Sequence, residues 1–112
     1  MIDDIFCKII KGELPTDKVY EDDEFIVIKD IHPQAPVHLL IVPKQHVFGM
    51  HDATPELLGQ AMVVADKVAQ KVGIAEKGYR LILNEGDHGG KLVPHLHIHL
   101  LGGKSLGTKI VK

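Results

Sequence analysis

The strongest hydrophobic pattern of the chain lies in residues 54–73, where apolar side chains recur every three or four residues. This is the spacing of one helix face. The apolar positions are Leu57, Leu58, Ala61, Met62, Ala65, Val68, Ala69 and Val72. Thr54 suits the N-cap, Pro55 suits the first helical position, and Gly73 follows the last turn. We therefore expect one long amphipathic helix whose apolar face packs on a sheet.

The other apolar stretches are short, and most are rich in β-branched side chains, which favours strands. Residues 18–20 and 25–28 flank an acidic turn and predict a hairpin, and residues 37–42 predict a third strand after a proline-containing loop. Residues 79–84 and 94–101 predict the last two strands. The order of these segments indicates an α+β fold with an antiparallel sheet of about five strands.

A short helix is expected ahead of the sheet, so that the fold has one main helix and one short N-terminal helix. Its apolar positions are Ile5, Phe6, Ile9 and Ile10. Asp3 or Asp4 can cap its first turn, and Gly12 and Pro15 end it. A sheet this small with long apolar edges favours dimerisation, because an edge strand presents unpaired backbone groups.

Length and composition limit the classes of protein that the chain can represent. With 112 residues, 45% of them hydrophobic and 25% charged, it fits one soluble domain spanning residues 1–112. No stretch of the sequence approaches the roughly 18 apolar residues of a membrane span. The net charge of −2 argues against electrostatic binding of nucleic acid. The acidic start of the chain and its single cysteine, Cys7, lead us to expect a cytoplasmic protein.

Eight histidines in 112 residues are unusual, and three of them alternate with apolar residues near the C-terminus. On a strand, His95, His97 and His99 would share one face at intervals of roughly 6.5–7 Å, opposite the apolar side chains of the same segment. His38, which has apolar neighbours on the third predicted strand, is the candidate for a fourth member. An excess of histidine indicates proton, phosphoryl or metal chemistry.

Three interpretations of this histidine ladder stay open. The first is a row of solvent-exposed histidines without function. The second is zinc, because histidines at positions i and i+2 of a strand can ligate one ion; we expect no carboxylate beside the ladder to orient metal ligands, which argues against this interpretation. The third is phosphorus chemistry, because the loop of residues 86–91 offers three glycines and a cation to a phosphate. A nucleophilic imidazole must be neutral, and two histidine neighbours would lower the pKa of the central His97.

Residues 95–101 resemble the signature of the histidine triad nucleotide-binding proteins, in which histidine alternates with hydrophobic residues. Further blocks resemble the same family, in the same order, along nearly the whole chain. They are residues 5–10, 30–36, 38–44, 78–80, 84–86 and 101–103. The resemblance implies a homodimer with a purine nucleotide substrate, no metal or other cofactor, and no nucleic-acid or membrane partner. It implies a hydrolase similar to purine nucleoside phosphoramidases, in which His97 attacks the α-phosphorus and forms a nucleotidyl-histidine intermediate.

The resemblance also implies roles for other residues. His95, His99 and His38 would orient and polarise the reacting centre, and Asp30 would accept hydrogen bonds from the ribose hydroxyls. The remaining nucleotide-binding positions would be Ile31, Asn84, Gly90, Lys91 and Leu92, with Ile5, Phe6, Ile9 and Ile28 against the base. The last four residues are explained equally well as part of the core.

The chain departs from the family pattern at three places. Lys91 and Leu92 stand where the family commonly has glutamine followed by serine or threonine. Lys91 can contact a phosphate as a point charge, but Leu92 cannot donate a hydrogen bond to a leaving group. The alternative functions are therefore dinucleoside polyphosphate hydrolysis, or nucleotide or metal binding with little turnover. Asp4 stands three residues before Cys7, where zinc-binding relatives have a second cysteine, so we expect no strong zinc site.

Overall fold

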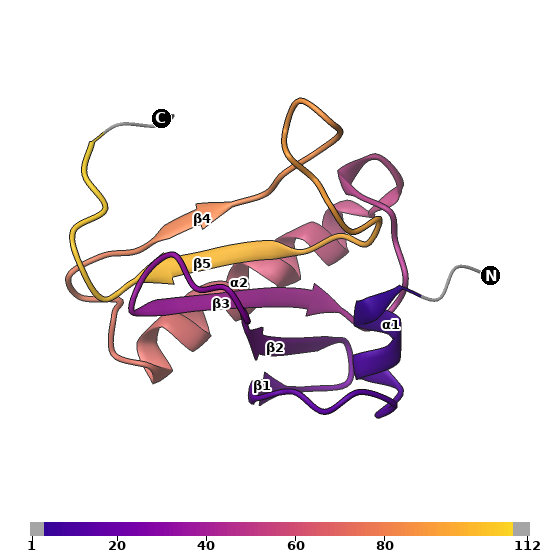
Figure 1. The fold of residues 1–112 in the computed structure, drawn as a ribbon, viewed down its shortest axis with the longest axis horizontal. Helices are drawn as coiled ribbons and strands as arrows, with labels where there is room; N and C mark the ends of the chain where they lie inside the picture. The colour runs from indigo at the N-terminus through magenta and orange to yellow at the C-terminus, as the bar shows by residue number, and fades with distance from the viewer. Residues whose placement is uncertain (1–3, 109–112) are drawn as a thin grey trace.

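The computed structural model describes residues 4–108 and has the expected α+β architecture. Its elements are α1 (Ile5–Ile10), β1 (Lys18–Glu21), β2 (Phe25–Lys29), β3 (Val37–Pro43), the short 3-10 helix η1 (Met50–Asp52), α2 (Pro55–Lys71), β4 (Arg80–Ile82) and β5 (Ile98–Gly102). The five strands form one antiparallel sheet in the order β1-β2-β3-β5-β4 (Figure 1). The predicted hairpin, the long helix and the short N-terminal helix are all confirmed.

Both helices begin at the predicted caps. The hydroxyl oxygen of Thr54 accepts from the backbone N–H of Leu57 at 3.1 Å, and a carboxylate oxygen of Asp4 accepts from the backbone N–H of Cys7 at 2.8 Å. Asp3, the alternative cap, lies outside the described residues. Gly73 has a φ of 82°, a conformation that glycine adopts without strain as the chain leaves α2. Among residues 4–108, no helix is long and apolar enough to cross a bilayer.

The sheet buries both of its faces, because successive strand side chains point to opposite sides. The face covered by α2 carries Phe25, Val27, Leu39, Ile41, Ile98 and Leu100, which pack with Ala61, Val64, Ala65, Val68 and Ala69 of the helix. The opposite face carries Ile26, Ile28, Leu40 and Val42, which pack with Phe6 of α1. α1 covers one end of this second face (Figure 1). His38 and His99 lie on the same face as Leu40, because Leu40 is two residues from His38 and pairs with His99.

The last two strands are shorter than the sequence predicts. β4 covers residues 80–82 of the predicted 79–84, and β5 begins at Ile98 instead of residue 94. The chain before β5 lies outside the sheet because the backbone N–H of Leu96 donates to the carbonyl of Val47, 2.8 Å away, and takes no part in the strand ladder. Only one of the three alternating histidines therefore lies on a strand.

Candidate functional site

His38 and His99 come from the neighbouring strands β3 and β5. In the ladder, His38 lies opposite Leu101 and Leu40 lies opposite His99, so the two imidazoles are diagonal neighbours on one face. Their facing nitrogens, Nε2 of His38 and Nδ1 of His99, are 2.9 Å apart. The backbone N–H of Gln34 donates to His38 Nδ1 at 3.0 Å, so the proton of a neutral His38 sits on Nε2 and is donated to His99. A neutral His99 then carries its own proton on Nε2, where a substrate can accept it.

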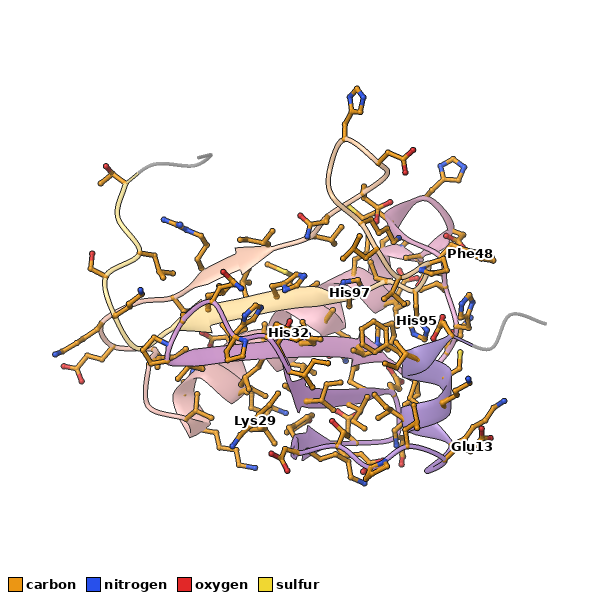
Figure 2. All side chains as sticks on the ribbon, in the orientation of Figure 1. Glu13, Lys29, His32, Phe48, His95 and His97 are labelled. Atoms are coloured by element: carbon orange, nitrogen blue, oxygen red, sulfur yellow. The ribbon has the colours of Figure 1, made fainter. Side chains whose placement is uncertain are left out.

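His97 is held in the opposite tautomer. Its Nδ1 lies 2.7 Å from the carbonyl oxygen of His95, so Nδ1 donates its proton and Nε2 keeps a free lone pair. The ring centroid of His97 is 5.2 Å from that of His99 and 5.0 Å from that of Phe6. Figure 2 shows His97 over the sheet, with His95 closer to α1. The site therefore places an unprotonated imidazole nitrogen beside an imidazole that can donate.

Burial keeps these imidazoles neutral. It is the main cause that lowers the pKa of His97, and the positive charge of Lys91 adds to it. Burial, together with repulsion from His97 and His38, lowers the pKa of His99 to about 4. The expected direction for the central histidine is confirmed, although burial contributes more than the histidine neighbours.

His95 does not take the position predicted for it. Its side chain is fully buried, with Nδ1 3.1 Å from a carboxylate oxygen of Asp4 and Nε2 2.9 Å from the carbonyl oxygen of Pro43. Its ring packs edge-on against that of Phe6, with centroids 5.6 Å apart. The prediction of three evenly spaced imidazoles along one strand is therefore wrong, because His95 and His97 precede β5 and each follows its own hydrogen bonds.

Two carboxylates reach the histidines, so the expectation that none lies nearby is also wrong. Asp4 contacts His95, as described above, and Oδ2 of Asp30 lies 3.4 Å from Nε2 of His38. The other oxygen of Asp30 accepts from the backbone N–H of His32 at 2.8 Å. Asp4 is 91 residues from His95 in sequence, so folding brings these two residues together. Asp30 contacts His38, which follows it after a short loop.

The side chain of Lys91 forms hydrogen bonds within the protein. Its ammonium group donates to the carbonyl oxygen of Phe48 and to the carboxylate of Glu85, the latter at 3.3 Å. Only 12% of its side chain is exposed. Two of the three N–H donors of the ammonium group therefore already have acceptors within the protein.

Three of the other positions implied by the resemblance, Asn84, Gly90 and Leu92, follow β4, whereas Ile31 follows β2. Asn84 is half-buried just after β4, and Gly90 has a φ of 78°, which a side chain would strain. Leu92 and Ile31 are 92% and 79% exposed. The structure thus leaves two large apolar side chains open to a ligand or a second chain.

The four residues proposed to lie against a base divide into two kinds. Phe6 and Ile28 are buried in the small core under α1, and Ile9 packs against that core. Ile5 is 45% exposed. Phe6 also contacts His97, so this core packs directly against the candidate reacting centre.

Comparison with known proteins agrees with this geometry. The HIT domain family matches residues 11–106. The chain belongs to the HIT domain family. Purine nucleoside phosphoramidase of Escherichia coli (strain K12) is 49% identical over 109 residues, which covers 95% of this chain and 92% of the relative. A HIT family hydrolase from Clostridium thermocellum has a TM-score of 0.94 at 50% identity and covers 99% of each chain. A histidine triad protein from Clostridium difficile has a TM-score of 0.91 at 42% identity, with 97% of each chain covered.

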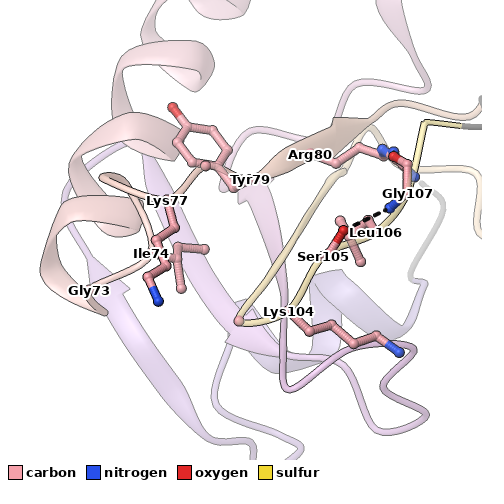
Figure 3. A pocket seen from close by; sticks show the side chains of 11 residues that line it. Gly73, Ile74, Lys77, Tyr79, Arg80, Lys104, Ser105, Leu106 and Gly107 are labelled. Carbon is pink, nitrogen blue, oxygen red and sulfur yellow. Dashed lines mark hydrogen bonds between the residues drawn. The ribbon is translucent and has the colours of Figure 1, made fainter.

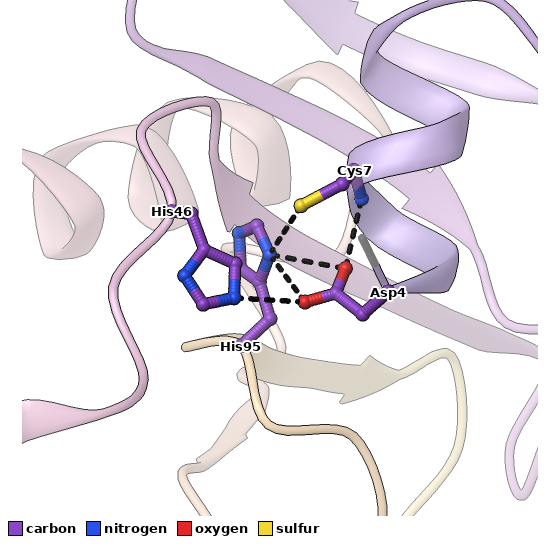
Figure 4. A group of neighbouring side chains, drawn as sticks. All are labelled: Asp4, Cys7, His46 and His95. Atoms are coloured by element: carbon purple, nitrogen blue, oxygen red, sulfur yellow. Dashed lines mark hydrogen bonds and ion pairs between the residues drawn. The ribbon is translucent and has the colours of Figure 1, made fainter. Parts of the chain in front are cut away.

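A second polar cluster of this HIT protein joins α1 to His95, the first of the three alternating histidines, which are called the triad below (Figure 4). Oδ2 of Asp4 lies 3.0 Å from Nε2 of His46 and 3.1 Å from Nδ1 of His95, and Sγ of Cys7 lies 3.8 Å from the same Nδ1. Asp4 and Cys7 are one helical turn apart, the spacing already noted in the sequence. His46 was missed, because nothing in its own segment connects it with α1.

The donor types of this cluster fit zinc. One potential ligand atom from each of Asp4, Cys7, His46 and His95 lies within 4.8 Å of the others, and carboxylate, thiolate and imidazole all bind that ion. An ion held there would cross-link α1 to the segment before β5 and would contribute structure only. Asp30, His38 and His99 form a second such group.

Two cavities of this HIT protein lie away from the triad histidines. One, of about 880 Å³, lies where the chain leaves β5 and is lined by the basic residues Lys77, Arg80 and Lys104 among others (Figure 3). The second, of about 540 Å³, is lined by Lys91 and Leu92 among others. Neither cavity has a triad histidine in its lining.

Proposed function

We propose that this HIT protein is a hydrolase that cleaves nucleoside 5'-phosphoramidates, with an adenosine-type nucleoside, through a covalent intermediate on His97. The observation that carries the proposal is the tautomer of His97, whose Nδ1 is bound to the carbonyl of His95 while Nε2 is free. A neutral imidazole nitrogen of this kind is the nucleophile that attack on phosphorus requires. The identity with the phosphoramidase of Escherichia coli supports the substrate class.

The proposed reaction has two steps. Nε2 of His97 attacks the α-phosphorus, the bond from phosphorus to the amine nitrogen breaks, and the nitrogen takes up a proton from solvent as the neutral amine leaves. Water then attacks the same phosphorus, the bond to Nε2 breaks, and the proton of the water goes to solvent as the nucleoside monophosphate leaves. The carbonyl of His95 stabilises the positive charge that the ring of His97 carries in the intermediate, because it accepts from Nδ1 throughout.

His99 is proposed to stabilise the charge on the phosphate oxygens. Its Nε2 proton is available because Nδ1 already accepts from His38. A fixed donor aimed at an oxygen that gains charge typically contributes about 10²–10³-fold to turnover. His38 acts through His99 and does not itself need to touch the substrate.

Binding of the nucleoside is proposed for the part of this face next to α1. Asp30 directly follows β2, and one of its oxygens lies 3.4 Å from Nε2 of His38. This position supports its proposed role as an acceptor for the ribose hydroxyls. The half-buried Ile9 of α1 packs on the core that contains Phe6 and Ile28, and we propose that it contacts the base together with the exposed Ile5 and Ile31.

We further propose a homodimer, in the cytoplasm. β4 is at the edge of the sheet, where its outer backbone groups can pair with another strand. Met62 and Val63 of α2 and Ile82 of β4 are exposed by 51%, 56% and 37%. Size-exclusion chromatography with light scattering should give the mass of two chains, and Ile82→Lys should shift the protein to one. A wild-type protein with the mass of one chain would refute the dimer.

Leu92 supports dinucleoside polyphosphate hydrolysis as the second candidate. An amine leaves more readily when a neighbouring group donates a hydrogen bond to it, and the side chain of Leu92 has no donor. A phosphate leaving group needs no such donor. Lys91, one residue earlier, already has two partners of its own.

A side-by-side assay tests the proposal. The protein is incubated with adenosine 5'-phosphoramidate and with a diadenosine polyphosphate at equal concentration, and release of adenosine monophosphate is followed. Faster hydrolysis of the phosphoramidate, with a rapidly quenched sample that gains the mass of one adenylyl group on His97, supports the first candidate. Faster hydrolysis of the polyphosphate supports the second. Binding of adenosine monophosphate without turnover of either compound would refute both enzymatic functions.

A further inference from the structure

Asp4 occupies the centre of the cluster that joins α1 to the triad (Figure 4). Only 5% of its side chain is exposed, and its two oxygens accept from three groups: the backbone N–H of Cys7, Nε2 of His46 and Nδ1 of His95. Both ring nitrogens of His95 face acceptors, the Asp4 carboxylate and the Pro43 carbonyl. The carboxylate of Asp4 thus connects the first turn of α1 with both His46 and His95.

We propose that Asp4 anchors α1 to the first triad histidine without a metal ion, and that through His95 it positions His97. The carboxylate does the work that a cross-linking ion would do, since it holds two imidazoles and the first turn of α1 at once. A cysteine at this position would leave two thiols facing two imidazoles, a donor set that needs zinc to bring it together. A single residue therefore decides whether the anchor depends on metal.

The anchor reaches the reacting centre by two routes. The ring of His95 is fixed between Asp4 and Pro43, and its own carbonyl accepts from Nδ1 of His97 at 2.7 Å. The helix that Asp4 caps also carries Phe6, whose ring centroid lies 5.0 Å from that of His97. A loosened His95 would therefore misplace Nε2 of His97, the nitrogen that must face phosphorus. Asp4 is a positioning residue in this scheme, because it touches no reacting atom.

Two substitutions at position 4 separate its roles. Asp4→Asn keeps a good N-cap and the shape of the side chain, but it loses the charge and turns an N–H₂ group toward imidazole donors. We expect Tm to fall by roughly 5–10 °C and kcat to fall about tenfold, while the affinity for adenosine monophosphate changes less than threefold. Asp66→Asn is the matched control, because Asp66 also accepts two side-chain bonds but lies on α2. It should leave kcat unchanged.

Asp4→Cys tests the metal. After treatment with EDTA this variant should show the same low Tm and kcat as Asp4→Asn, and one equivalent of zinc should restore both. The wild-type protein should show the same Tm and kcat with EDTA and with zinc at one equivalent. The kinetic measurements rest on the proposed function, but the Tm measurements do not. An inactive wild-type protein would therefore refute the proposed function, and the role of Asp4 as an anchor would still be tested by Tm.

Two results would overturn the inference. One is a wild-type Tm that drops in EDTA and returns with zinc, which would make the four residues a metal centre with Asp4 as a ligand. The other is an Asp4→Asn protein with wild-type Tm and kcat, which would leave Asp4 without a positioning role.

Discussion

Lowering the pH tests whether the fold keeps the triad neutral. An imidazole with the ordinary pKa of about 6.5 is neutral in only about a tenth of molecules at pH 5.5. The pKa of His99 is lowered by burial and by its histidine neighbours to about 4, so nearly all molecules keep it neutral at that pH. Burial shifts the pKa of His97 in the same direction. Because the pKa values of both histidines are lowered, we expect kcat/KM for a phosphoramidate to fall between pH 7.5 and pH 5.5 by clearly less than the roughly tenfold that unperturbed histidines would lose.

The assay is a steady-state pH profile from 5 to 8.5 at constant ionic strength, with a fluorogenic adenosine phosphoramidate. His97→Asn protein gives the background at each pH, because phosphorus–nitrogen bonds also break in acid without an enzyme. An acid limb with a midpoint near 6.5 in the wild type would refute the reasoning, since it would mean that burial does not protect the nucleophile.

Lys91 gives this prediction a second test. Its positive charge lowers the pKa of His97 in addition to burial, so Lys91→Gln should move the acid limb of kcat/KM to higher pH. Lys67→Gln is the matched control, because Lys67 lies on α2 beside Tyr20. An equal movement of the midpoint in both variants would show that net charge acts at long range and that Lys91 has no specific effect.

Four further predictions follow from named contacts. His97→Asn should abolish phosphoramidate turnover and still bind adenosine monophosphate by calorimetry; residual turnover above 1% of wild type would rule out the covalent mechanism. Gly89→Ala should lower turnover, because a Cβ there would collide with the backbone of Glu85, whereas Gly59→Ala meets open space on α2 and should stabilise the fold by about 0.5–1 kcal/mol in denaturant unfolding. Leu92→Ser should raise kcat for phosphoramidates by up to roughly 10- to 100-fold, the equivalent of about 1.5–3 kcal/mol, with little change in nucleotide affinity; an unchanged kcat would mean that position 92 does not reach the leaving group. The pKa of His99 is lowered in the folded protein, so its contribution to the free energy of unfolding is complete above pH 6.5 and is lost as the pH falls towards 4. The free energy of unfolding of His99→Gln should therefore depend less on pH across this window. Equal pH dependence in the variant and the wild type would contradict the lowered pKa.

The elements that the sequence predicts well are those whose signals are local. The long helix combines an N-cap, a proline at its first position and an apolar stripe within residues 54–73. The hairpin and the third strand are short β-branched runs bounded by turns, and each appears within a residue or two of its predicted bounds. The alternation of histidine and apolar residues wrongly predicted a strand at residues 94–97, because such a pattern does not show whether a neighbouring strand is available for pairing. The carbonyl of Val47 takes the backbone N–H that a ladder would have used.

The polar partners of the histidines could not be predicted, because they depend on contacts between distant segments. Asp4 is 91 residues from His95, and His46 is 42 residues from Asp4. Nothing in the composition of either segment connects them. The pairing of His38 with His99 could be foreseen as a shared face, but the tautomers follow only from the Gln34 backbone and the His95 carbonyl. The chemistry of the site therefore depends on backbone groups that a list of side chains does not contain.

Lys91 and Leu92, which both depart from the family pattern, stand together in the loop of residues 86–92. Lys91 binds the carbonyl of Phe48 and the carboxylate of Glu85, and Glu85 also accepts from the backbone N–H of Met50 at 3.4 Å. These bonds connect the loop before the triad to the segment that leads into α2. A glutamine could make either bond but could not neutralise Glu85, so the lysine stabilises the loop as well as raising the local positive charge. The side chain of Leu92 is then left almost wholly in solvent. Without a donor at position 92, the proposed site assists an amine leaving group less than a hydroxyl there would, and the increase in kcat expected for Leu92→Ser measures this difference.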